Sequence, residues 1–99
     1  MKKSDAILHL EKTSWLGSLH AYLGSPAIID DTRTEQYLWG YVFVFVPHQP
    51  EFSKREFAKL AVSSIDGRIA PAEERGISGV LQTFGIEPTD ENLTPITSE

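Results

Sequence analysis

Residues 37–46 read YLWGYVFVFV, an unbroken apolar stretch with the pattern of a buried β-strand. Successive side chains of a strand point to opposite faces. One face would then be aromatic, with Tyr37, Trp39, Tyr41, Phe43 and Phe45. The opposite face, which begins at Leu38, is apolar as well. Such a strand either lies at the centre of a sheet covered on both sides, or leaves one face exposed for a partner.

The length of 99 residues corresponds to one domain with a thin hydrophobic core. We expect a single α+β domain over residues 1–86. Residues 87–99 are rich in Pro, Thr and acidic side chains, and we expect them to form a flexible, disordered tail.

Nine Lys and Arg against fourteen Asp and Glu give a net charge of −5. The basic residues are scattered, so the usual electrostatic basis for nucleic-acid binding is missing, and an acidic surface favours a basic partner. Cysteine is absent, which excludes disulfides and thiolate chemistry and fits a reducing compartment. The sequence shows neither a signal peptide nor an apolar run long enough for a membrane helix, so we expect a cytoplasmic protein with no membrane partner.

The segment before the aromatic run predicts a long helix and a short strand. Apolar residues recur at helical spacing over residues 5–23, with Ser4 as N-cap and Gly24 at the end. Residues 27–30 are expected to form a strand, and residues 31–35 a polar turn.

The segment after the aromatic run is ambiguous between helix and strand over residues 57–65. Residues 53–56 have the form of a helix capping box, whereas the aromatic strand needs a neighbour on each edge. We expect a short turn of helix over residues 54–58, then a strand from Lys59 to about Ile65 that ends in a turn at Asp66 and Gly67.

A second helix is expected over residues 72–84, started near Pro71 and ended by Gly85. The predicted fold is therefore α+β, with an N-terminal helix, a C-terminal helix and a three-stranded antiparallel sheet. Residues 37–46 form its central strand.

No catalytic, metal or cofactor site is indicated. His9 and His20 would share a helix face about 16 Å apart, too far to bind one metal ion. His48 lies in a Pro-flanked loop without a carboxylate or nucleophile at a suitable spacing. We therefore favour a protein that is not an enzyme.

Residues 64–73 resemble the second half of an EF-hand loop. The matching residues are Ser64, Asp66, Gly67, Ile69 and Glu73. The first ligand position would be Val62, which cannot bind calcium. Tellurite-resistance B-like helical domains carry a similar degenerate loop, and this resemblance implies a structural helix–loop–helix.

A larger part of the chain is similar to the YrhB-like immunity-protein family. The similarity rests on a helix, residues 28–30, residues 39–43, an apolar strand ending at residues 66–69, and a final helix. This chain has a shorter stretch between the two strands, lacks the Gly-Asn-x-Pro-like segment of that family, and has an additional acidic tail. The resemblance implies a protein-binding function and assigns no functional residue.

The aromatic face supplies the candidate partner-binding residues, because Tyr and Trp are enriched at binding hot spots. They are Tyr37, Trp39, Tyr41 and Phe43, and the alternative interpretation is that they are core beneath the N-terminal helix. The favoured function is that of a small acidic intracellular protein that binds another protein, as an immunity protein, antitoxin or inhibitor does. One alternative is an enzyme or small-molecule binder with a pocket between sheet and helix, using His48 or Tyr41 as acid or base. Another is a self-associating module, such as a homodimer.

Overall fold

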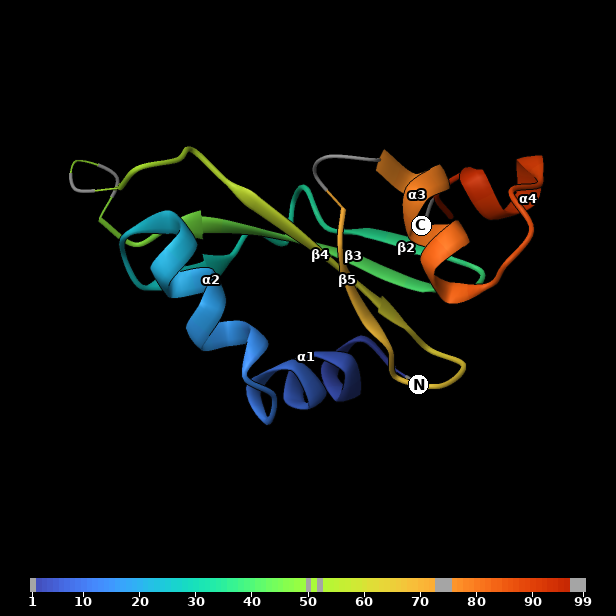
Figure 1. The fold of residues 1–99 in the computed structure, drawn as a ribbon, viewed down its shortest axis with the longest axis horizontal. Helices are drawn as coiled ribbons and strands as arrows, with labels where there is room; N and C mark the ends of the chain where they lie inside the picture. The colour runs from blue at the N-terminus through green and yellow to red at the C-terminus, as the bar shows by residue number, and fades with distance from the viewer. Residues whose placement is uncertain (1, 50, 52, 73–75, 97–99) are drawn as a thin grey trace.

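The computed structural model describes residues 2–49, 51, 53–72 and 76–96, which form helices on both sides of one antiparallel sheet (Figure 1). In chain order the elements are α1 (Lys3–Glu11), α2 (Trp15–Leu23), β1 (Ala27–Ile29), β2 (Glu35–Tyr37), β3 (Gly40–Pro47), β4 (Ala58–Ser63), β5 (Ile69–Pro71), α3 (Gly76–Phe84) and α4 (Asp90–Leu93). The predicted α+β class is confirmed. The expected three strands and two helices are wrong, since the described residues form five strands and four helices.

Strand β3 is central in the sheet, as predicted. The strand order is β1-β3-β4-β5, and β2 pairs with β3 on the same side as β1. Ile28 of β1 pairs with Val46, whereas Gln36 of β2 pairs with Tyr41. Strands β1 and β2 thus form one interrupted neighbour of β3.

The predicted strand over residues 37–46 is broken near its start. Tyr37 ends β2 and pairs with Gly40 of β3, so that Leu38 and Trp39 form the turn of a hairpin. The chain approaches β4 so closely here that a Cβ atom on Gly40 would lie 2.0 Å from the Val62 carbonyl oxygen. Only glycine fits this position, and the turn reverses the chain ahead of β3.

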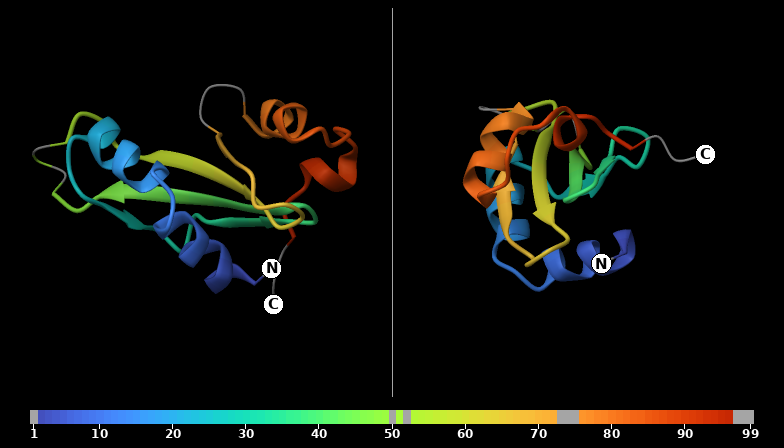
Figure 2. Two further views of the ribbon diagram at one scale, coloured as in Figure 1. Left: turned by 60° about the horizontal axis from the view of Figure 1, so that its bottom comes forward. Right: turned by 90° about the vertical axis from the view of Figure 1, so that its right-hand side faces the viewer.

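Two helical layers cover the two faces of the sheet (Figure 2). Helices α1 and α2 cover one face, and the largest side chains of this first core are Leu10, Leu23, Tyr41, Phe43 and Phe45. Helices α3 and α4 cover part of the other face, where the second core contains Tyr37, Trp39, Val42, Leu81 and Phe84. Every residue of β3 except Val46 is buried, which accounts for the lack of polar residues in this strand.

The single helix predicted over residues 5–23 is in fact two helices. The Thr13 hydroxyl donates to the Leu10 carbonyl over 2.8 Å and accepts a 3.3 Å hydrogen bond from the Trp15 amide. These bonds replace helical ones, as Thr side chains commonly do at helix ends. The chain bends at Lys12–Ser14 so that α1 and α2 follow the sheet.

Three further expectations need correction. Residues 54–58 form bends and the start of β4 instead of a helical turn, although the strand predicted from Lys59 is confirmed. Residues 64–68 connect β4 to β5, so the EF-hand-like loop joins two strands and not two helices. The second predicted helix begins at Gly76 within the described residues, and Ala72 is not helical. Its expected residues 73–75, with Glu73 of the loop pattern, lie outside the described residues.

The structure describes the expected tail as far as Ile96. It contains α4, and Leu93 packs against the second core. The Ile96 amide donates a 2.7 Å hydrogen bond to the Gln36 carbonyl, forming an isolated bridge with β2. Residues 97–99 lie outside the described part of the chain. None of the helices in the described ranges has the length and apolar character needed to cross a membrane.

Candidate functional site

The four aromatic residues proposed from the sequence are buried. Tyr37 is 4% exposed, Trp39 2%, Tyr41 7% and Phe43 0%. They also lie on opposite faces, because Tyr37 stacks on Trp39 in the second core and Tyr41 stacks on Phe43 in the first. The expectation of one common aromatic face is therefore wrong. These side chains have the packing of core residues, which was the alternative interpretation.

The polar tips of the two aromatic residues in the second core are satisfied within the protein. The Tyr37 hydroxyl donates to Glu35 Oε1 over 3.2 Å, and the Trp39 indole N–H donates to the Asn92 carbonyl over 2.9 Å. Burial, together with the nearby Glu35 carboxylate, raises the pKa of Tyr37 to about 12. The phenol is therefore neutral at physiological pH and acts as a structural donor.

The histidines are separated in the structure. His9 Nε2 donates a 2.8 Å hydrogen bond to the Gly67 carbonyl, which ties α1 to the β4–β5 loop. His20 is half-buried on α2, and His48 is exposed just after β3. Within the described ranges, no group of three or more His, Asp and Glu residues could hold a metal ion.

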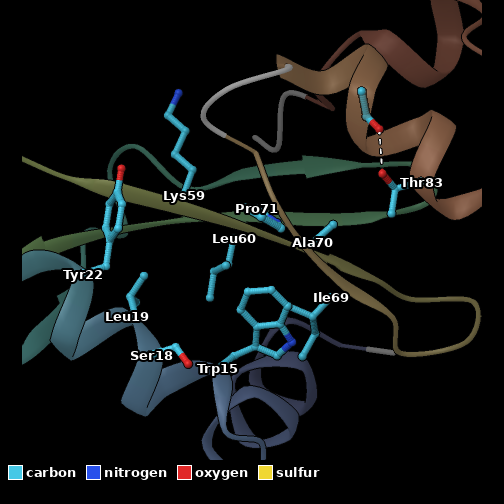
Figure 3. Close-up of a pocket in the computed structure, with 11 residues that line it drawn as sticks. Trp15, Ser18, Leu19, Tyr22, Lys59, Leu60, Ile69, Ala70, Pro71 and Thr83 are labelled. Carbon is cyan, nitrogen blue, oxygen red and sulfur yellow. Dashed lines mark hydrogen bonds between the residues drawn. The ribbon is translucent and has the colours of Figure 1, made fainter.

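A groove of about 650 Å³ runs along the outer edge of β5, between α2 and α3 (Figure 3). Its α2 wall is one helix face, with Trp15, Ser18, Leu19 and Tyr22. Residues at these spacings line up on a helix, and Trp15 and Leu19 also contact the first core. Figure 3 shows the side chains of Trp15, Leu19, Leu60 and Ile69 directed toward one shared space.

Strand β5 forms the floor of the groove. The Ser63 amide donates to the Arg68 carbonyl, and the Ala72 amide donates to the Lys59 carbonyl. Because bonded and outward-facing residues alternate along an antiparallel strand, the backbone groups of Ile69 and Pro71 point away from β4 into the groove. Ile69 therefore offers an N–H and a C=O group, whereas Pro71 offers only a C=O group.

Helix α3 supplies the opposite wall through Gly79 and Thr83. The Thr83 hydroxyl donates to the Gly79 carbonyl over 3.0 Å, the dashed line in Figure 3. This bond occupies the hydroxyl hydrogen within its own helix. The α3 wall is thus small and of low polarity.

Few ionisable side chains line the groove. No carboxylate or imidazole occurs among the described residues that line the groove. The ionisable groups there are those of Tyr22 and Lys59. Lys59 Nζ lies 5.7 Å from the centre of the Phe57 ring, and its side chain points away from Leu60 in Figure 3. An acid–base pair facing a common reactant is therefore missing from the described lining.

The sequence contained one signal for this site. Trp15, Leu19 and Tyr22 recur at helical spacing, but the same pattern fits a helix that packs only on a sheet. The groove depends on β5, which was not predicted from the sequence, and on the α3 wall opposite. Comparisons with protein families, curated proteins and solved structures found no match to this chain.

Proposed function

We propose that the protein acts by binding another protein, as immunity proteins, antitoxins and inhibitors do, and that the groove receives an extended segment of that partner. The main support is the outer edge of β5, which faces an apolar groove and where the backbone groups of Ile69 point away from β4. An extended peptide can add to such an edge as a further strand, with backbone hydrogen bonds giving affinity and side-chain pockets giving specificity.

The two walls define which side chains the added strand can carry. Side chains of a strand alternate between faces. Every second residue would point toward Trp15 and Leu60, which favours a large apolar group. The residues between them would point toward Gly79 and Thr83, which favours small or weakly polar groups. The expected partner segment is short, because Pro71 removes one backbone donor from the edge.

Aromatic residues on α2 add to this binding surface. Tyr22 is 41% exposed, and the Arg55 guanidinium lies 4.3 Å from the centre of its ring. A stacked cation holds the ring in place and reduces the entropy lost on binding. Trp and Tyr bury a large area with few rotatable bonds, which makes Trp15 and Tyr22 suitable anchors.

The partner is proposed to carry net positive charge, since the chain has a net charge of −5 that speeds association with a basic protein. The absence of cysteine fits a cytoplasmic setting. The similarity of residues 28–30, 39–43 and 66–69 to YrhB-like immunity proteins points to the same class of function.

A substitution that places a large side chain in the groove tests the proposed binding function. Ser18 is exposed on the α2 wall, so Ser18→Arg places a long side chain across the groove without disturbing the core. Ser4→Arg makes the same change on the exposed face of α1, away from the groove. Tagged wild type and both variants are used in parallel to capture proteins from the source lysate, and the captured proteins are quantified by mass spectrometry.

The expected result is one stoichiometric partner that wild type and Ser4→Arg retain and Ser18→Arg loses. A partner retained equally by all three proteins would place binding outside the groove. Panning of a random peptide library against wild type should also enrich alternating large and small apolar residues. No enrichment above the Ser18→Arg background would contradict strand addition.

A small-molecule binder is the second candidate, favoured by the groove volume of about 650 Å³, which lies in the usual range for ligand sites. A metabolite that raises the melting temperature of wild type and Ser4→Arg, but not of Ser18→Arg, would support it.

A further inference from the structure

The sheet has three outer edges, and they differ in how far other parts of the chain protect them from pairing with a further strand. The edge of β5 lies in the groove and contains Pro71. The edge of β2 is bridged by Ile96. The remaining edge is β1, Ala27–Ile29, which contains no proline and pairs with β3 alone among the described strands. Natural proteins usually blunt or cover such an edge, so an open one is a candidate for pairing with another strand.

The backbone groups that β1 presents can be assigned from its hydrogen bonds. The His48 amide donates to the Pro26 carbonyl over 2.8 Å, and the Asp30 amide donates to the Val44 carbonyl over 2.8 Å. Residues 26, 28 and 30 therefore face β3, and the N–H and C=O groups of Ala27 and Ile29 point outward. The free edge consists of these two residues on either side of Ile28.

An apolar row runs inward from this edge on the second face. Ile28 is 49% exposed, its partner Val46 is half-buried, and Phe57, which precedes β4, is 38% exposed. Helices α3 and α4 lie toward the other end of the sheet in Figure 1. They form their core with Trp39 and Val42, and the row lies outside that core. The Arg33 guanidinium and the Lys59 ammonium lie 5.8 and 5.7 Å from the centre of the Phe57 ring, at the inner end of the row.

We propose that β1 pairs in antiparallel fashion with β1 of a second copy of this chain, with the two-fold axis at Ile28. In this register Ala27 of each copy lies opposite Ile29 of the other, and all outward N–H and C=O groups of both residues form hydrogen bonds. The two Ile28 side chains become direct cross-strand neighbours, at the close spacing of a non-hydrogen-bonded pair. The row of partly exposed apolar side chains that includes Ile28 then continues from one copy to the other.

The charges at the two ends of β1 favour a second copy as the occupant. Lys54 lies beside the C-terminal end of α2, which shortly precedes β1. Its amide donates to the Leu23 carbonyl, and its side chain packs beside Gly24. Asp31 follows the end of β1 and is largely exposed, with Lys3 at 3.1 Å. An antiparallel pair brings the Asp31 end of each copy toward the Lys54 end of the other. A closed two-fold contact needs this kind of self-complementarity.

This contact goes beyond the proposed groove function and uses a different edge of the sheet. A three-residue strand pair is small compared with a standard protein interface, so we expect a dimer that dissociates on dilution. Sedimentation velocity over a range of protein concentrations, up to about 1 mM, therefore measures it directly. Wild type should pass from the monomer mass toward twice that mass as the concentration rises.

Charged substitutions of Ile28 test whether the two-fold axis lies at this residue. Ile28→Lys and Ile28→Glu each remove the buried pair of isoleucines and place like charges opposite one another, and they should raise the dimer Kd by about tenfold or more. Mixing the two variants places Lys opposite Glu and should restore dimerisation. Leu38→Lys changes a comparably exposed residue, 59% exposed in the β2–β3 turn, and should dimerise like wild type.

Circular dichroism of each variant confirms the fold before the masses are compared. Wild type that stays monomeric up to about 1 mM overturns the proposal. Dimerisation of Ile28→Lys or Ile28→Glu alone with the wild-type Kd overturns it as well, since residue 28 would then lie outside the contact. Failure of the mixed variants to dimerise overturns the two-fold axis at Ile28.

Discussion

The indole N–H of Trp39 donates a 2.9 Å hydrogen bond to the backbone carbonyl of Asn92, 53 residues further along the chain. Trp39 is 2% exposed and packs edge-on against Phe84, with 5.8 Å between the ring centres. The C-terminal segment therefore closes the second core over the β2–β3 turn. Its second attachment is the bond from the Ile96 amide to the Gln36 carbonyl.

A chain that ends at Ile86 should lose stability for this reason. It lacks both hydrogen bonds and the packing of Leu93, and leaves the Trp39 N–H without its partner. We expect the free energy of unfolding to fall by about 2–4 kcal/mol, as measured by urea denaturation. A chain that ends at Ile96 keeps these contacts and serves as the control. Equal stability of the two chains would show that the segment contributes nothing.

The aromatic side chains of β3 should behave as core. Phe43 is fully buried beneath the first helical layer, so Phe43→Ala should lower the free energy of unfolding by about 3–5 kcal/mol. Leu38→Ala, at a 59% exposed turn position in the same apolar run, should change it by less than about 0.5 kcal/mol. Thermal and urea denaturation distinguish the two. Similar small effects would mean that Phe43 is not part of a packed core.

The central part of the fold could be predicted because β3 carries a strong local signal. Its alternating aromatic and β-branched residues have few stable positions outside a sheet. The same pattern concealed the hairpin, because Leu38 and Trp39 are apolar and only Gly40 marks the turn. The break between α1 and α2 was concealed in a similar way, since Thr13 and Ser14 interrupt the helix without Gly or Pro.

The candidate groove could not be predicted from the sequence, because it depends on tertiary placement. Ile69 and Pro71 look like the end of a turn, and they become an edge strand only when paired with β4. Trp15 and Tyr22 were visible on one helix face. Whether that face meets the sheet or a groove depends on where β5 and α3 lie, and no local pattern contains this information.

Alanine substitutions at Gly17, inside α2, and at Gly24, directly after it, should have opposite effects on stability. Gly17 has a helical backbone, and no neighbouring atom lies within 4 Å of the place that a methyl group would occupy, so Gly17→Ala should stabilise the protein by about 0.5–1 kcal/mol. Gly24 ends α2 at φ +77°, where a side chain is strained and would press on Lys54. Gly24→Ala should therefore destabilise the protein by about 1–2 kcal/mol. Melting temperatures compare both variants with wild type, and a change of the same sign in both would contradict these backbone assignments.

Stability at alkaline pH should depend on Tyr37. Burial and the Glu35 carboxylate raise its pKa from 10.0 to about 12, so the folded protein retains the phenolic proton at a pH where the unfolded chain releases it. The contribution of this group to stability is fully present below pH 10. It is lost as the pH rises through the interval from 10 to about 12. Tyr37→Phe removes the titration, so the stability difference between wild type and this variant should shift against wild type across that interval. Urea denaturation of both proteins at a series of alkaline pH values measures this difference. The other tyrosines and the lysines titrate in both proteins, so their effect on stability cancels in the difference. A constant difference over the whole interval would show that the Tyr37 hydroxyl has the same pKa in the folded and unfolded protein.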